Sequence, residues 1–468
     1  FIRDADGSEA LALGGHSARE LRSRADDLQA AADSVALQQM NYVRLRLTAR
    51  GLRRSAVLGR LRLLEPAPSL AKMSRRSADD MAVIVEDLVK ELDELHGAVI
   101  PEIKYEAGER CVPLIQAGSW LEGGGAVFAE NEALRWIADL VGMPAEAGGV
   151  FVSGGTAGNL SALIAARHRW RERAAGAHDR TRGLIVASKG AHSSVASAAR
   201  AMDADVVMVA ADAEGRLQVD SLRECIEGLD SIDSARLFAV VATCGTTNAG
   251  VIDPLEAVAE VAGELGIWFH VDGAYGGAGL VAPSVRDRYR GIEHADSFIV
   301  DPHKWLFAPF DCCALLYRDP LQARRAHTQH AEYLDVLQHD DEWNPSDFAH
   351  HLSRRARGLP FWFSLATYGT AAYRDAVEQS LTVAHEGADR IAAAEHLELV
   401  MRPELSVVLF RRRGWTPDEY QRWSDRLLAD GVGFVVPTSW NGETVLRLCV
   451  VNPRTTIDDI QLIIDSLA

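Results

Sequence analysis

The sequence contains few or none of several features, and each absence excludes a class of protein. Its 468 residues include only six cysteines, without a CxxC pair, so we expect free thiols in a reducing cytoplasm and no metal site. No apolar run is long enough to span a bilayer, and the amino terminus lacks the apolar segment of a signal peptide. Basic charge is scarce too, since 49 lysines and arginines face 66 acidic residues and leave a net charge of -17. We therefore expect no nucleic acid and no membrane among its partners.

The main exception is an arginine-rich stretch at residues 41–64, which holds seven arginines and no acidic side chain. Such a stretch can form an arm for a membrane surface or nucleic acid, or the solvated face of a helix that docks on another subunit. The acidity of the remaining chain favours docking. Apolar residues recur at three- and four-residue intervals elsewhere in residues 1–100, so we predict a helical amino-terminal segment that clasps a neighbouring domain or subunit.

A series of short apolar segments begins near residue 149, most of them separated by helix-like stretches. Segments that are apolar on both faces and joined by helices indicate a mostly parallel sheet buried between helices. The predicted fold class is therefore α/β, with a doubly wound, seven-stranded sheet in a large domain at residues 101–355. The predicted strands lie at 149–153, 183–188, 205–210, 236–243, 267–272, 297–300 and 312–318.

The pattern changes after about residue 355. The segments 404–414, 432–437 and 444–452 alternate or run apolar, with turn signals between them, which is typical of strands. Residues 455–467 have the spacing of a final amphipathic helix. We predict a small α+β domain at residues 356–468.

Two reactive side chains stand at the ends of predicted strands. Asp272 ends the strand in HVDGAYGG, and Lys304 follows the strand in ADSFIVDPHKWL. A lysine amine can bind the aldehyde carbon of pyridoxal 5'-phosphate (PLP), while a carboxylate keeps the ring nitrogen protonated. Such a pair indicates chemistry at the α-carbon of an amino acid. The alternative is an aspartate that caps a strand end and a solvated lysine.

Polar residues at several other strand ends favour the cofactor. In open parallel sheets, ligands bind outside the carboxyl ends of the strands. Gly155 and Thr156 lie between a strand and a helix start, where backbone N–H groups can donate to a phosphate, although a plain turn is the alternative. His192 opens the next helix-like stretch, so it either caps that helix or lies flat on the pyridine ring.

These segments together resemble the PLP-dependent group II amino-acid decarboxylases, which include aromatic-amino-acid, histidine and glutamate decarboxylases. The resemblance covers the chain from about residue 130 onward and is carried by HVDGAYGG, ADSFIVDPHKWL, AHSSV and VLRLCVVNP. It implies the PLP-dependent transferase fold of type I and a homodimer with shared active sites.

The resemblance also implies roles for individual residues. Lys304 would bind PLP covalently with His303 beside it, Asp272 would pair with the ring nitrogen, and His192 would stack on the ring. Ala274 would pack against the other face. The implied cofactor site consists of Gly155, Thr156, His192, Thr247, Asp272, Ala274, Asp301, His303 and Lys304.

Further residues are implied on the substrate side. Tyr333 resembles the mobile-loop tyrosine that protonates the α-carbon after carbon dioxide leaves, with an ordinary loop tyrosine as the alternative. Arg354 resembles the arginine that contacts the substrate carboxylate, with a solvated helix-start arginine as the alternative. Ser353 and Trp120 would line the substrate pocket. The chain departs from the family at Ala157, where glutamate is usual, and its His-Pro-aromatic segment is not recognisable before Trp120.

The predicted function is decarboxylation of an L-amino acid to an amine. Ser353 resembles relatives that use tyrosine, DOPA or histidine, whereas the VVNP ending is closer to glutamate and diaminobutyrate decarboxylases. We expect an aromatic substrate. The rivals are an aminotransferase or aldehyde synthase on the same fold, which the presence of His192 and Tyr333 disfavours, and a silent scaffold, which intact Lys304 and Asp272 disfavour.

Overall fold

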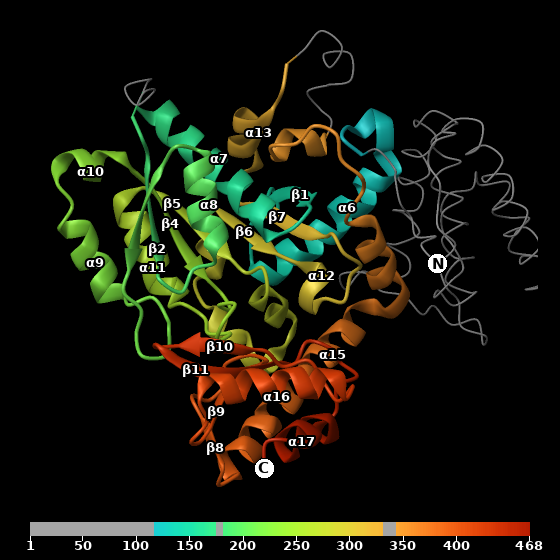
Figure 1. The fold of residues 1–468 in the computed structure, drawn as a ribbon. Coiled ribbons are helices and arrows are strands. Elements are labelled where there is room, and N and C mark those ends of the chain that lie inside the picture. The colour runs from blue at the N-terminus through green and yellow to red at the C-terminus, as the bar shows by residue number, and fades with distance from the viewer. Residues whose placement is uncertain (1–116, 175–180, 331–342) are drawn as a thin grey trace, which may run out of the picture. The chain divides into compact units, whose positions relative to one another are not determined.

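A computed structural model describes residues 117–174, 181–330 and 343–468 (Figure 1). The predicted amino-terminal helices and the arginine-rich stretch lie outside the described residues, and the predicted domain boundaries stay predictions. The described chain forms two compact units, each built from segments that are far apart in the sequence. The first unit comprises 117–137, 148–151, 323–330 and 343–371, and the second comprises 138–147, 152–174, 181–322 and 372–468.

Seven strands form the main sheet, and each one corresponds to an apolar segment predicted from the sequence. Their residues are almost all buried, except in the edge strand β3, where Met208 is exposed. Burial of both faces is what helices on a parallel sheet require, and it explains why these strands lack alternation. The strands are β1 (Gly148–Val152), β2 (Leu184–Ser188), β3 (Asp205–Val209), β4 (Leu237–Thr243), β5 (Trp268–Asp272), β6 (Ser297–Val300) and β7 (Cys313–Tyr317).

The strand order is β1-β7-β6-β5-β4-β2-β3 (Figure 1). Strands β3, β2, β4, β5 and β6 are parallel, and β7 runs antiparallel to β6. The register places Thr243 of β4 beside Asp272 of β5, and Asp272 beside Ile299 of β6. The carboxyl ends of three neighbouring strands therefore meet at one edge. The predicted α/β class with a mostly parallel sheet is confirmed.

Helices connect the strands and cover them. Helix α7 (Gly155–Arg173) packs on β4 to β7 and on α8 (Ser193–Ala201), and α11 (Leu255–Leu265) packs on β4 and β5. Within the described residues, no helix is long and apolar enough to cross a membrane. In the described ranges the further α-helices are α6 (Trp120–Val141), α9 (Val219–Glu227), α10 (Ser231–Arg236), α12 (Pro302–Trp305), α13 (Pro320–His327), α15 (Leu359–Ala393), α16 (Pro417–Ala429) and α17 (Ile457–Asp465), and short 3-10 helices span Gly276–Val281, Pro283–Tyr289, Ile292–His294 and Pro345–Phe348.

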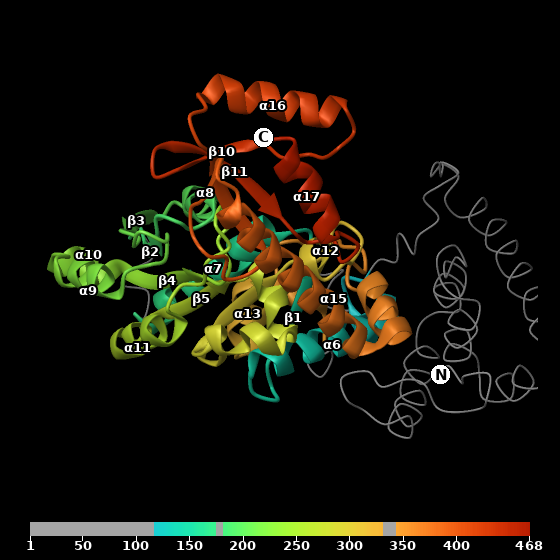
Figure 2. The same cartoon turned by 90° about the horizontal axis from the view of Figure 1, so that it is seen from below.

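A second sheet of four antiparallel strands lies near the carboxyl terminus, in the order β10-β11-β9-β8. Helices α16 and α17 lie against it (Figure 2). They share with it a core that includes Phe410 and Trp423. Helix α17 begins with a capping box in which Thr456 and Asp459 satisfy each other's backbone N–H groups. The strands are β8 (Leu397–Leu399), β9 (Val407–Arg412), β10 (Pro437–Trp440) and β11 (Glu443–Cys449).

One predicted strand is wrong. Residues 432–436 adopt no regular structure, and β10 begins only at Pro437, the last residue of the predicted segment. Val435 is buried in the small core, but Val432, Phe434 and Val436 are exposed. Apolar composition alone cannot separate a strand from an extended loop that buries one side chain.

Candidate active site

A cavity of about 410 Å³ lies at the carboxyl ends of β4, β5 and β6, within the second unit. This volume falls in the range of about 300–1,000 Å³ that is typical of small-ligand sites. All nine residues predicted to hold the cofactor line it, so the fold brings them together. The lining residues are Ser153, Gly154, Gly155, Thr156, Ala157, Asn159, His192, Ser194, Thr243, Gly245, Thr247, Asp272, Ala274, Tyr275, Asp301, His303, Lys304, Phe310 and Asp311.

Asp272 is a buried carboxylate at the end of β5, with 3% of its surface exposed. Its Oδ1 accepts a hydrogen bond from the backbone N–H of Ala274 at 3.0 Å, and its Oδ2 accepts one from Asn159 Nδ2 at 2.8 Å. Donors to both oxygens stabilise the ionised form of a buried carboxylate. A negative charge is therefore held at this wall of the cavity.

Lys304 lies on the short helix α12, directly after β6. Its Nζ is 2.9 Å from Asp301 Oδ2, and the same oxygen accepts the backbone N–H of Gly155 at 3.3 Å. Asp301 is 1% exposed, whereas the Lys304 side chain is 43% exposed. The buried carboxylate thus holds a reachable amine at the cavity wall, beside the first turn of α7.

His192 caps helix α8, and it also lines the cavity. Its Nδ1 accepts the backbone N–H of Ser194 at 3.2 Å and lies 2.8 Å from Ser194 Oγ. The two interpretations weighed from the sequence are therefore not alternatives. Because the cap holds one edge of the imidazole, the ring is fixed at the cavity.

His303 follows Asp301 by two residues and is held from two sides. Its Nδ1 accepts the backbone N–H of Cys312 at 2.9 Å, and its ring meets that of Phe310 edge-on with centroids 5.0 Å apart. Phe310 is 80% exposed, so a large apolar ring stands at the mouth of the cavity. Such a ring can contact whatever enters.

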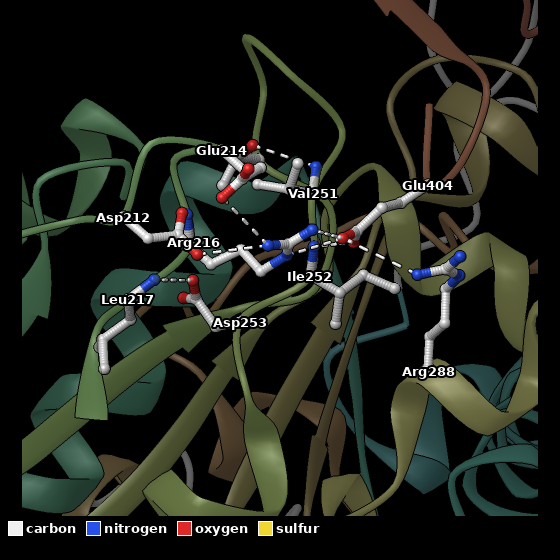
Figure 3. A network of polar contacts seen from close by, with 10 residues as sticks. Asp212, Glu214, Arg216, Leu217, Val251, Ile252, Asp253, Arg288 and Glu404 are labelled. Carbon is white, nitrogen blue, oxygen red and sulfur yellow. Dashed lines mark hydrogen bonds and ion pairs between the residues drawn. The ribbon is translucent and has the colours of Figure 1, made fainter. Parts of the chain in front are cut away.

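Thr247 lies in the loop that follows β4. Buried carboxylates hold that loop in place (Figure 3). Asp253 accepts the backbone N–H of Thr243 and that of Leu217, both at 2.7 Å. Burial raises the pKa of Asp253 to about 6. Asp253 ends the loop, and its carboxylate binds the backbone N–H of Thr243, where the loop begins. This one residue therefore holds the two ends of the loop together.

Glu404, between β8 and β9, joins the carboxyl-terminal sheet to the same loop (Figure 3). Its Oε2 accepts the backbone N–H of Ile252 at 2.8 Å, and its Oε1 accepts Arg216 Nε at 2.7 Å. Arg447 of β11 also donates to the Thr247 carbonyl. The carboxyl-terminal sheet thus contributes to the shape of the cavity without lining it.

The residues present fit PLP. The first turn of α7 offers backbone N–H groups for a phosphate, and Asp272 offers a carboxylate for a ring nitrogen. Lys304 offers an amine at the same cavity. Thr243 Oγ1 is buried and has no hydrogen-bond partner among the described residues, which is the state expected of a side chain that meets a polar ligand. A Cβ on Gly155 would lie 3.1 Å from that of Ala274, so glycine leaves room there.

Several lining residues were missed from the sequence, among them Asn159, Ser194, Thr243, Tyr275 and Phe310. Asn159 follows Gly155 by four residues and so lies on the same face of α7 as the predicted phosphate cup. That four-residue spacing would have been enough to predict Asn159 as a lining residue. Thr243 was also predictable, because it is the last residue of β4. Phe310 was not, because it lies in a loop between α12 and β7.

The predicted substrate residues are not among those that line the cavity. Tyr333 lies outside the described residues. Trp120, Ser353 and Arg354 belong to the first unit. Arg354 is fully buried there: its guanidinium pairs with Glu130 at 2.7 and 2.8 Å and donates to the carbonyls of Ala117 and Phe151. This geometry favours a structural role over contact with a substrate carboxylate.

Residues 123–413 match the model of the pyridoxal-dependent decarboxylase conserved domain. This range includes the residues that line the cavity. The chain belongs to the pyridoxal-dependent decarboxylases. The protein is therefore a PLP-dependent carboxy-lyase, and its cofactor is PLP, as predicted.

Curated relatives and solved structures agree with this assignment. The chain is 30% identical to an aromatic-L-amino-acid decarboxylase of Bacillus atrophaeus over 354 residues, which covers 73% of this chain and 72% of the relative. It is 34% identical to an L-2,4-diaminobutyrate decarboxylase of Rhizobium meliloti over 373 residues, covering 75% and 71%. The crystal structure of Oryza sativa TDC with PLP and tryptamine aligns with a TM-score of 0.70 at 26% identity, covering 75% of this chain and 77% of that one.

Replacing Glu404 tests whether the carboxyl-terminal sheet supports the cavity. Glu404→Ala leaves the buried N–H of Ile252 unpaired, which costs about 1–3 kcal/mol of folding free energy. We expect a lower melting temperature and weaker PLP binding in equilibrium dialysis. The exposed Glu260→Ala on α11 is the matched control. Unchanged PLP affinity in Glu404→Ala would show that the sheet and the cavity are uncoupled.

Replacing Arg354 separates its two possible roles. Arg354→Lys cannot reproduce the bidentate pair with Glu130. We expect a melting temperature lower by several degrees, with the KM for the amino acid little changed. A raised KM at an unchanged melting temperature would instead assign Arg354 to the substrate.

Proposed function

We propose that the protein decarboxylates an aromatic L-amino acid to its amine. The carrying observation is a cavity that joins a reachable amine, a buried carboxylate and a helix start, with an exposed phenylalanine at its mouth. The similarity to an aromatic-L-amino-acid decarboxylase supports this substrate. Diaminobutyrate is the second candidate, because the chain is 34% identical to an L-2,4-diaminobutyrate decarboxylase.

The residues of the cavity divide the work between them. PLP, when bound, draws electrons from the α-carbon of an amino acid. Lys304 would bond the cofactor aldehyde, and Asp301 holds the Lys304 amine in place. Asp272 would accept the hydrogen bond of the ring nitrogen and favour its protonated form. The backbone N–H of Thr156 at the start of α7 would donate to the phosphate, and that of Gly155, which donates to Asp301 Oδ2 in this structure, would turn to it when PLP binds.

The remaining residues orient and close the site. His192 would cover one ring face and Ala274 the other, while Thr247 and His303 would border the cofactor. Tyr333 would return a proton to the α-carbon after carbon dioxide leaves. Ser353 and Trp120 would bound the substrate side chain. We further propose that the protein is a cytoplasmic homodimer whose subunits complete each other's active sites. Sedimentation would reveal the dimer.

Replacing Lys304 tests the assignment of the cofactor-binding amine. Lys304→Ala should lose the visible absorbance of bound PLP and all turnover, because no other amine lines the cavity among the described residues. In the wild type, borohydride reduction followed by peptide mapping should label Lys304. Label on another lysine, or an active variant, would refute this role. Lys189→Ala, outside the cavity lining, is the matched control.

The substrate is tested by carbon dioxide release across the common amino acids, DOPA and diaminobutyrate. We expect kcat/KM to be highest for an aromatic substrate, with one amine formed per carbon dioxide. A preference for diaminobutyrate or glutamate would overturn the aromatic assignment. Aldehyde and hydrogen peroxide, measured in the same assays, would identify an aldehyde synthase instead.

A further inference from the structure

A chain of buried hydrogen bonds runs from Asp272 at the cavity wall through Asn159, His270 and Ser297, to which the sequence assigned no role. Asn159 Nδ2 donates to Asp272 Oδ2 and to Ser194 Oγ, both at 2.8 Å. Asn159 Oδ1 lies 2.8 Å from His270 Nε2, and His270 Nδ1 lies 2.8 Å from Ser297 Oγ. All five residues are at most 3% exposed. Buried polar groups that satisfy one another specify a single arrangement of their side chains.

The two ends of this chain fix its direction. At one end, Trp268 Nε1 lies 2.8 Å from Ser297 Oγ, and an indole N–H can only donate. At the other end, the Asp272 carboxylate can only accept. The Asp272 end sets the direction, and the Trp268 end agrees with it, because a Ser297 hydroxyl that accepts from Trp268 can donate its own proton to His270.

The direction determines the proton positions of the residues in between. Asn159 turns Nδ2 to the carboxylate, so its Oδ1 faces His270, which has to donate from Nε2. The Nδ1 of His270 then accepts the hydroxyl proton of Ser297. Burial lowers the pKa of His270 to about 4, so the ring carries one proton at neutral pH, as this arrangement requires.

A branch of the chain reaches His192. Ser194 Oγ accepts from Asn159 and lies 2.8 Å from His192 Nδ1. The backbone N–H of Ser194 donates to the same nitrogen. Because a backbone N–H can only donate, Nδ1 is an acceptor, and the ring proton of neutral His192 lies on Nε2.

We propose that Asn159 and His270 are positioning residues, which keep Asp272 a hydrogen-bond acceptor toward the cavity. The proposal rests on the role proposed above for Asp272 and is independent of the substrate. Donation from Asn159 stabilises the Asp272 carboxylate, so a proton shared with a ring nitrogen stays on the ring. His270 prevents the Asn159 amide from turning its oxygen toward the carboxylate.

The first test needs no cofactor. In the apo protein labelled with ¹⁵N-histidine, the ring nitrogen resonances report which nitrogen carries the proton. We expect His270 to be neutral with its proton on Nε2 at pH 7, and His192 Nδ1 to be an acceptor. A proton on His270 Nδ1, or a doubly protonated His270 ring at pH 7, would overturn the proposal.

The second test measures the effect on the bound cofactor. Asn159→Leu keeps the side-chain size but removes both donors, and loss of a hydrogen bond to a charged group corresponds to about tenfold or more in affinity. We expect PLP binding weaker by that factor, and the ring nitrogen of ¹⁵N-labelled PLP shifted toward its unprotonated resonance. His270→Phe should act in the same direction, and His270→Gln, which can donate and accept, should restore much of the loss.

The control is Ser424→Ala, which removes a buried hydrogen bond to the Val435 carbonyl in the small core, 2.6 Å long. It should leave PLP affinity and the ring nitrogen resonance unchanged. The proposal would be overturned if both Asn159→Leu and His270→Phe kept the PLP affinity and the ring nitrogen resonance of the wild type. Asp272→Asn separates the two hypotheses: if it leaves the ring nitrogen protonated, the role of Asp272 fails, whereas the apo-protein histidine resonances still report on the chain behind it.

Discussion

The arrangement depends on one buried negative charge, the Asp272 carboxylate at the end of β5. A buried carboxylate is unfavourable unless donors satisfy its oxygens. The turn after the strand supplies the N–H of Ala274, and helix α7 supplies Asn159. The same contacts connect the strand, the helix and the cavity. Because this one carboxylate needs hydrogen-bond donors, it fixes how β5 and helix α7 are placed at the cavity.

A similar rule governs the loop that carries Thr247. Asp253 and Glu404 are buried carboxylates that bind backbone N–H groups at both ends of this loop. Arg216 balances the charge of Glu404. Backbone bonds within the loop, such as those from Gly245 and Thr246 to the Val251 carbonyl, leave some N–H groups unpaired, and side chains satisfy these. The carboxyl-terminal sheet takes part in this way, although it does not line the cavity.

Much of the sheet and the cofactor wall could be predicted because the signals are local. Seven apolar segments became seven strands, since burial on both faces leaves a continuous apolar run. Asp272 and Lys304 could be placed together because carboxyl ends of parallel strands share an edge. The segment 432–437 failed because an extended loop that buries only Val435 has the same composition as a strand.

What the sequence alone determined is therefore the class of the protein: strands, helices and reactive side chains follow from spacing along the chain. Which atoms meet was decided by the tertiary structure. The contact of Asn159 with Asp272 joins residues 113 positions apart, and that of Glu404 with Ile252 joins residues 152 apart. The pairing of Arg354 with Glu130 spans 224 positions. Such contacts depend on how helices and sheets pack, because no pattern along the chain records the direction in which a distant side chain points.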